Sequence, residues 1–395
     1  MINPNRHLRI FIIAGEASGD ILGASFIKAL KNIHPNAEFY GVGGEQMQKE
    51  GFQSIFPMEE LSVMGLAEVL PKLFSILKRI KQTVNEIIIR KPDVVLTIDS
   101  PDFCFRVVKK LKAQNKKIPC VHYVAPSVWA WRPGRAKKVS EFLDHILTLL
   151  PFEPPYFEEH GLKATFIGHP IVEKISSRGD GERFRQKYNI ASNDPILSIL
   201  PGSRVSEISR LLTVFAKTSD KILQKKPNTV IVIPTLPHLK KYIEDFFRGK
   251  GINPIITTDI ADKFDCFAAS SVAIAASGTV SLELALTDTP HIIAYKVSPI
   301  SAFFAKFFIK TKYFNLVNIL LNKLAIPELL QERCDPNIIY QEVLKLLEEK
   351  QARTNQLVDF REALIKIGLS DTETPSDKAA NTVLEIIDQS GAPLL

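Results

Sequence analysis

The feature that most constrains the fold of this chain is a recurring order of buried strand, small-residue loop and helix start. It is clearest at residues 271–286, where 271–275 are small and β-prone, 276–279 form a tight turn, and helical spacing resumes at Val280. The same order occurs in both halves of the chain. Such an alternation of strands and helices is typical of α/β proteins with parallel sheets.

The turn at 276–279 predicts a phosphate site. A helix start presents free backbone N–H groups and the positive end of a dipole, and Gly278 allows a close backbone approach. Ser277 and Thr279 add hydroxyl donors, and Glu283, one turn later, can accept hydrogen bonds from a ribose diol. The alternative is an ordinary capped helix whose Glu283 is only solvated, because many strand-to-helix turns bind nothing.

The first copy of the pattern lies near the N-terminus, where the apolar run 8–14 leads into the loop 15–20 and then into a helix from Ile21. This loop lacks the Lys-Ser/Thr of a P-loop and does not fit G-x-G-x-x-G, so nucleotide hydrolysis and dinucleotide binding are not favoured. Its two acids, Glu16 and Asp20, repel phosphate. We expect this loop to bind hydroxyl or amide groups.

The second copy opens the second half of the chain. A strand at 196–200 precedes Pro201, Gly202, Ser203 and Arg204, and a helix follows. The fixed guanidinium fork of Arg204 can hold a diphosphate through two hydrogen bonds.

A chain of 395 residues is too long for one ordinary core, so we expect two doubly wound domains that face each other across a ligand-binding cleft. Polar and glycine content rises near 171–178, which is typical of a linker. The predicted division is 1–172, 173–360 and a helical tail, 361–395, that can pack back on the first domain.

A candidate general base follows the strand predicted at 92–98. An α/β sheet places its ligands just beyond the carboxyl ends of its strands, and Asp99 occupies that position. A carboxylate in a partly dry cleft can accept a proton from an alcohol. The alternative is an N-cap for the next helix, a role that Asp102 fits better. A metal site at this pair is not expected, because hard cations require more oxygen ligands.

The most amphipathic region of the chain is 61–89, where lysines surround an apolar face. Pro71 is expected to break it into two helices. One interpretation is a helix packed on the sheet; the other is a face that enters a membrane, and a second basic, aromatic segment at 295–321 is a further candidate for lipid contact. The predicted membrane-contact residues are Val69, Leu70, Leu73, Phe74 and Leu77.

The loop at 125–132 holds Trp129 and Trp131, the only two tryptophans of the chain, beside Arg132. This loop is either an exposed binding wall or a segment folded onto the core, and the residues do not decide between them.

Composition narrows the class of function. The net charge of +7 suits anionic phosphates or an anionic lipid surface, but no Lys/Arg run is interleaved with aromatics in an RNA-reading pattern, so nucleic-acid binding is not predicted. The four cysteines are far apart without a C-x-x-C, which is typical of reduced core thiols in a cytoplasmic protein. The short apolar run near the N-terminus is too brief for a signal sequence, and no uncharged window can span a bilayer.

These loops together resemble the lipid A disaccharide synthase family, membrane-surface glycosyltransferases (family 19) of Gram-negative bacteria. The order of the matching pieces over nearly the whole chain makes the resemblance specific, whereas no single motif would. The pieces are GEASGD at 15–20, DSPDF at 99–103, PSVWAW at 126–131, GHP at 168–170, PGSR at 201–204, SGT at 277–279 with Glu283, and Asn318 with Gln331.

The resemblance implies a GT-B fold with an N-terminal acceptor and membrane-contact domain and a C-terminal UDP-sugar domain. It implies that UDP-2,3-diacylglucosamine and 2,3-diacylglucosamine 1-phosphate (lipid X) are joined, with inversion, into a β-1,6-linked disaccharide 1-phosphate and UDP. Asp99 matches the family's proposed base. The implied donor residues are Gly202, Ser203, Arg204, Ser277, Gly278, Thr279 and Glu283, and the implied acceptor or sugar residues are Glu16, Ser18, Asp20, Asn318 and Gln331.

The resemblance implies no cofactor, and no metal is expected, since preorganised charge can replace one and no D-x-D motif is present. It also implies anionic inner-membrane lipids as partners and a peripheral location on the cytoplasmic face of the inner membrane, and it allows a homodimer. Two rival classes stay open: a non-hydrolysing UDP-sugar epimerase on the same two-domain plan, and a two-domain binding protein of the periplasmic type, which would normally carry an export signal.

Overall fold

The computed structural model describes the chain except for residues 1–6, 62–65, 116, 132–133, 299–310 and 391–395, and it describes side chains for the rest except 66–73, 176 and 177. Arg132 and residues 299–310 of the second predicted lipid-contact segment therefore lie outside the described residues. The chain forms two compact units. We call Met1–Pro170 with Ser370–Leu395 the N-terminal unit, and Ile171–Leu369 the C-terminal unit.

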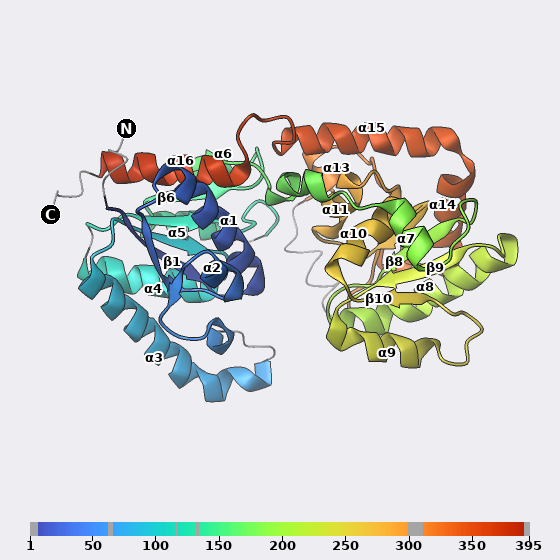
Figure 1. The fold of residues 1–395 in the computed structure, drawn as a ribbon, viewed down its shortest axis with the longest axis horizontal. Helices are drawn as coiled ribbons and strands as arrows, with labels where there is room; N and C mark the ends of the chain where they lie inside the picture. The colour runs from blue at the N-terminus through green and yellow to red at the C-terminus, as the bar shows by residue number, and fades with distance from the viewer. Residues whose placement is uncertain (1–6, 62–65, 116, 132–133, 299–310, 391–395) are drawn as a thin grey trace. The chain divides into compact units, whose positions relative to one another are not determined.

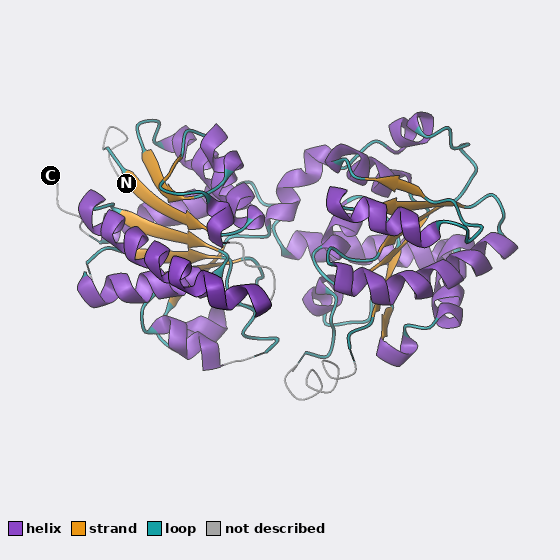
Figure 2. Cartoon of the chain, turned by 90° about the horizontal axis from the view of Figure 1, so that it is seen from below, coloured by secondary structure: helices purple, strands orange, loops and turns teal. Residues whose placement is uncertain are grey.

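The N-terminal unit is built on a seven-stranded parallel sheet in the order β3-β2-β1-β4-β5-β6-β7, with helices on both faces (Figure 2). Its strands are β1 (Arg9–Ala14), β2 (Glu38–Val42), β3 (Gln53–Ser54), β4 (Val94–Ile98), β5 (Cys120–Tyr123), β6 (His145–Thr148) and β7 (Lys163–Phe166). Its helices are α1 (Ala17–Ile33), α2 (Glu45–Lys49), η1 (Met58–Leu61), α3 (Leu66–Arg90), α4 (Pro101–Gln114), α5 (Gly134–Ser140), α6 (Pro154–Glu158) and α16 (Pro375–Gln389), and η2 (Pro170–Ser177) joins the two units.

Two hydrophobic clusters fill the faces of this sheet. Alternate residues of a strand point to opposite sides, so Phe11 and Ile13 pack with residues of α3 and α4, whereas Ile10 and Ile12 pack with residues of α1 and α16. The C-terminal helix α16 thus lies against α1, far from it in sequence (Figure 1).

The C-terminal unit repeats the plan with a six-stranded parallel sheet in the order β10-β9-β8-β11-β12-β13. Its strands are β8 (Ile196–Leu200), β9 (Val230–Pro234), β10 (Ile255–Thr257), β11 (Val272–Ala275), β12 (His291–Tyr295) and β13 (Glu328–Leu330). Its helices are α7 (Gly181–Lys187), α8 (Val205–Lys225), α9 (Pro237–Phe247), α10 (Ile260–Ala269), α11 (Val280–Leu286), α13 (Leu316–Leu321), η3 (Gln331–Arg333), α14 (Pro336–Glu348) and α15 (Lys350–Lys366).

Two details differ from the predictions. The tail boundary at 361 falls inside α15, which stays with the C-terminal unit because Phe360 and Leu364 are buried there, so only α16 returns to the N-terminal unit. Pro71 does not divide the amphipathic region, since α3 continues from Leu66 to Arg90. A proline removes one helical hydrogen bond and kinks a helix without having to end it.

Candidate active site

Asp99 lies directly after β4, at the carboxyl edge of the N-terminal sheet, as predicted. Asp99 and Ser100 both have left-handed backbones, with φ of 52° and 41°. Two consecutive non-glycine residues in this region store strain, and such strain is found mainly at functional sites. Gly15 is required beside them, because a Cβ there would lie 2.7 Å from Ser100 Oγ.

The structure brings the first glycine loop to Asp99. The Ser18 hydroxyl, in the first turn of α1, donates a hydrogen bond to Asp99 Oδ2 at 2.9 Å. The neighbouring Glu16 is exposed and is the N-cap residue of α1. Neither acid of the DSPDF motif caps α4: its N-cap residue is Ser100, and the side chain of Asp102 is 99% exposed. The capping alternative for Asp99 is therefore not supported.

Asp20, a predicted sugar contact, is bonded to the protein in this structure. Its side chain is buried, and both carboxylate oxygens accept hydrogen bonds from the backbone at the start of α2. The donors are the N–H groups of Gly44 (2.9 Å), Gln46 (2.9 Å) and Met47 (3.1 Å). An acid in the first turn of one helix can satisfy the free N–H groups at the start of a neighbouring helix as readily as bind a sugar.

Asp20→Ala is expected to lower the free energy of unfolding of the N-terminal unit by about 2–3 kcal/mol, because two buried and one partly buried N–H groups lose a charged acceptor. Urea denaturation measures this loss. Glu45→Ala is the matched control, since Glu45 forms an exposed ion pair with Lys49 on the same helix and should change stability by less than about 0.5 kcal/mol. Unchanged stability of Asp20→Ala with a raised acceptor KM would instead support the predicted sugar contact.

The two glycine loops of the C-terminal unit lie at one edge of its sheet. β8 and β11 are paired, with Leu200 opposite Ala275, so the loops 201–204 and 276–279 leave the sheet side by side. Arg204 is the N-cap residue of α8, and its side chain is 79% exposed, 3.6 Å from Glu207 Oε1.

The turn at 276–279 is open. Gly278 has φ of +137°, a backbone conformation that favours glycine, and a Cβ there would meet no protein atom within 4 Å. The Ser277 hydroxyl donates to the carbonyl of Phe314 at 3.4 Å. Thr279 is the exposed N-cap residue of α11 and forms no side-chain cap.

Glu283 is ion-paired, contrary to the picture of a solvated acid. Its carboxylate lies 2.6 Å from Lys263 Nζ, and its side chain is 14% exposed. Lys263 comes from α10, so sequence spacing gave no signal for this pair. Any ribose bound by Glu283 would share its oxygens with this lysine.

The side chains of Asn318 and Gln331 form hydrogen bonds with backbone groups of the protein. The Asn318 side chain is fully buried, and its Oδ1 accepts from the N–H groups of Ala325 and Ile326. Gln331 Oε1 accepts from the N–H of Val297 at 3.2 Å. Both polar atoms of the Asn318 amide are thus bonded to the protein in this structure, and its contact with a sugar stays a prediction.

The two tryptophans of the loop 125–132 fit different interpretations: one is folded onto the protein and the other is exposed. Trp129 Nε1 donates to Glu153 Oε1 at 3.0 Å, and its ring packs edge-on against Phe152. Burial raises the pKa of Glu153 to about 7, against the opposing effect of the Trp129 hydrogen bond. Trp129 is thus folded onto the protein, whereas Trp131 is 43% exposed.

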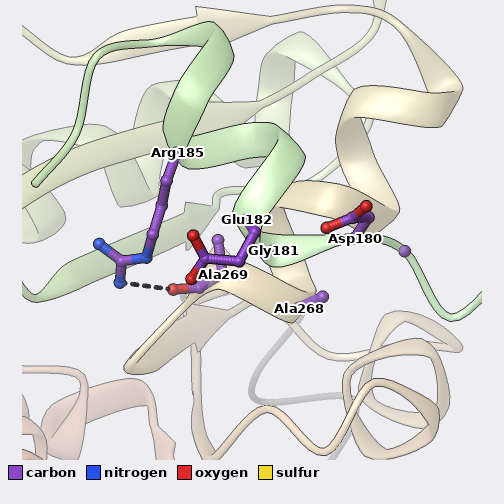
Figure 3. Close-up of a pocket in the computed structure, with 7 residues that line it drawn as sticks. Asp180, Gly181, Glu182, Arg185, Ala268 and Ala269 are labelled. Atoms are coloured by element: carbon purple, nitrogen blue, oxygen red, sulfur yellow. Dashed lines mark hydrogen bonds between the residues drawn. The ribbon is translucent and has the colours of Figure 1, made fainter. Parts of the chain in front are cut away.

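A cavity of about 590 Å³ lies away from these loops. It lies where α7 begins and α10 ends, at the amino edge of the C-terminal sheet (Figure 3). Arg185 donates there to the carbonyl of Ala269 at 3.2 Å. Gly181 allows close packing, since a Cβ there would lie 2.9 Å from the carbonyl oxygen of Ala268. A second cavity, about 410 Å³, adjoins the β2–α2 loop of the N-terminal unit.

Comparison with known proteins decides the family. The model of the lipid-A-disaccharide synthetase family matches residues 10–382. The chain belongs to the lipid-A-disaccharide synthase family. It is 48% identical to the lipid-A-disaccharide synthase of Rhodospirillum centenum, over 96% of this chain and 95% of that one. It is 39% identical to the enzyme of the same name from Pseudomonas syringae pv. tomato, over 98% of each chain.

Solved structures of similar fold confirm the GT-B architecture of the lipid-A-disaccharide synthase family member described here. Acinetobacter baumannii MurG matches with a TM-score of 0.59 at 12% identity, over 97% of this chain and all of that one. Staphylococcus aureus MnaA, solved with UDP, matches with a TM-score of 0.68 at 14% identity, over 96% and 97% of the chains. The UDP-GlcNAc 2-epimerase of Neisseria meningitidis, bound to UDP-GlcNAc, matches with a TM-score of 0.62 at 13% identity, over 97% of this chain and 100% of that one. The epimerases therefore share the fold, and the family match separates this chain from them.

Among the described residues, no helix is long and apolar enough to cross a membrane. In the same part of the chain, no cluster of three or more His, Cys, Asp or Glu side chains is arranged to hold a metal ion.

Proposed function

We propose that this lipid-A-disaccharide synthase family member transfers 2,3-diacylglucosamine from its UDP derivative to the 6-hydroxyl of lipid X. The products would be the β-1,6-linked disaccharide 1-phosphate and UDP. The observation that carries the proposal is Asp99, which stands on a strained backbone at the carboxyl edge of the N-terminal sheet with its carboxylate hydrogen-bonded to Ser18.

In the proposed reaction, Asp99 takes the proton from the acceptor 6-hydroxyl while that oxygen attacks the anomeric carbon of the donor. The bond from the anomeric carbon to the diphosphate oxygen breaks, the configuration inverts, and UDP leaves. Arg204 and the open turn at 277–279 stabilise the negative charge that develops on the diphosphate. Glu283, oriented by Lys263, accepts hydrogen bonds from the ribose.

The proposal assigns acceptor and membrane contact to the N-terminal unit and donor binding to the C-terminal unit. The membrane face is supported by α3, where Phe74 is 82% exposed and Leu77 is 47% exposed. Lys78 and Lys81 continue the i, i+4, i+7 spacing from Phe74 and are exposed. On this basis we propose peripheral binding to anionic lipid on the cytoplasmic face of the inner membrane; the side chains of Val69, Leu70 and Leu73 lie outside the described residues.

Replacing Phe74 and Leu77 together with serine is expected to weaken binding to anionic vesicles about tenfold, because two exposed apolar side chains would no longer enter the lipid. Vesicle sedimentation measures this binding. Val358→Ser on α15 is the control, since Val358 is 62% exposed but lies in the C-terminal unit. Equal vesicle binding by the double variant and the wild type would remove α3 as the membrane face.

The proposed function is tested by incubating the protein with UDP-2,3-diacylglucosamine, with lipid X, or with both, in the presence and absence of EDTA. UDP release that requires both lipids and survives EDTA supports the transferase. Formation of an epimerised UDP-sugar without acceptor would support the epimerase instead, and binding without turnover would support a binding protein.

A further inference from the structure

Glu207 lies under the loop 201–204 and makes contacts that its place in the first turn of α8 does not require. Its Oε1 accepts a hydrogen bond from the Tyr295 hydroxyl at 3.1 Å and lies 3.6 Å from a guanidinium nitrogen of Arg204. Its Oε2 accepts from the backbone N–H of Ser203 at 3.4 Å. One carboxylate therefore links two residues of the loop to β12.

The loop is shaped around this carboxylate. Gly202 has φ of +116°, and a Cβ there would lie 2.7 Å from Glu207 Oε2. Only glycine both adopts this backbone conformation readily and leaves room for the acid. The Glu207 side chain is 17% exposed, whereas that of Arg204 is 79% exposed, so the acid is fixed beneath a cation that reaches outward.

The Tyr295 hydroxyl fixes the acid in turn. Burial raises the pKa of the Tyr295 phenol, and the neighbouring Glu207 raises it further, so this hydroxyl stays protonated and donates. Because Tyr295 ends β12 and Arg204 follows β8, the contact joins the ends of two strands that are not neighbours in the sheet.

The negative charge of Glu207 and its contact with Arg204 predict opposite effects on the affinity for a diphosphate. A carboxylate beside a diphosphate site repels the ligand, so its removal would tighten binding if charge were its only influence. An acid that sets the direction of Arg204 instead improves binding, because a guanidinium held in one orientation loses less freedom when it meets a phosphate.

We propose that Glu207, oriented by Tyr295, is a positioning residue for the donor: it holds the loop 201–204 so that Arg204 points at the diphosphate. The inference rests on the proposed function, in which Arg204 contacts UDP. The simpler account is that Glu207 only caps α8; a capping acid affects stability without distinguishing donor from acceptor.

Titration calorimetry with UDP, together with steady-state kinetics, separates these accounts. Glu207→Ala is expected to weaken UDP binding about tenfold and to lower kcat/KM for the donor by a similar factor, with the acceptor KM unchanged. Glu207→Gln keeps an accepting oxygen and should fall between Ala and the wild type. In an Arg204→Ala background, Glu207→Ala should add less than about a twofold loss, because the residue acts through Arg204.

Tyr295→Phe removes one hydroxyl and is the second test if Glu207→Ala does not fold; it should weaken UDP binding about threefold. Asp220→Ala at the exposed far end of α8 and Tyr242→Phe on α9 are matched controls that should bind UDP like the wild type. UDP binding by Glu207→Ala or Glu207→Gln that equals or exceeds the wild-type affinity would overturn the inference alone. A wild type that binds no UDP would overturn the proposed function, and this inference with it.

Discussion

Asp99→Asn is expected to lower kcat by about 10²–10⁴ while UDP affinity stays unchanged. The amide keeps the size and hydrogen-bonding reach of the side chain but cannot take a proton from the acceptor hydroxyl. UDP release under saturating substrates measures kcat, and calorimetry measures UDP affinity.

Asp102→Asn is the matched control for this experiment. Asp102 belongs to the same motif, but its side chain is 99% exposed, so its replacement should leave kcat within about twofold of the wild type. Unaltered turnover of Asp99→Asn would remove Asp99 as the base. An equal loss in both variants would show that the motif serves the fold and not the proton transfer.

Arg204→Ala is expected to lower kcat/KM for the donor about 10²-fold, because the departing diphosphate loses a charged, two-pronged hydrogen-bond donor. Arg204→Lys should recover only part of this loss, since an ammonium keeps the charge but not the planar fork. The acceptor KM should stay the same in both variants.

Arg248→Ala controls for the loss of a surface arginine. The side chain of Arg248 is 79% exposed, like that of Arg204, and it is likewise ion-paired to an acid three residues away, Asp245. Arg248 lies at the end of α9, away from the loop 201–204. Arg248→Ala should leave kcat/KM for the donor unchanged. A change in Arg204→Ala confined to the acceptor KM would contradict the assignment of Arg204 to the donor.

The fold and the location of the candidate site follow from local sequence patterns. Apolar runs at 94–98, 196–200 and 272–275 are buried in parallel sheets, and the loops after them hold Asp99, Arg204 and Gly278 at strand ends. Both regularities depend only on the order of strand, loop and helix, which the sequence displays directly.

The direction of individual side chains was not predictable in the same way. Asp20 lies in the first turn of α1 and Asn318 in α13, but their polar atoms bond to groups that come close only in the folded chain. Lys263 and Glu207 were not predicted as site residues for the same reason. Lys263 pairs with Glu283 of another helix, and Tyr295 reaches Glu207 from a strand distant in sequence. A carboxylate or amide near a loop indicates that hydrogen bonds form there, but the sequence does not tell whether the partner is the substrate or the protein.

The central claim is a direct displacement in which the acceptor 6-hydroxyl, deprotonated by Asp99, attacks the anomeric carbon. Nuclear magnetic resonance of the disaccharide made by the wild-type protein tests it most directly. The account predicts a 1→6 linkage whose anomeric configuration is β, opposite to that of the donor. A product that retains the donor configuration would contradict it.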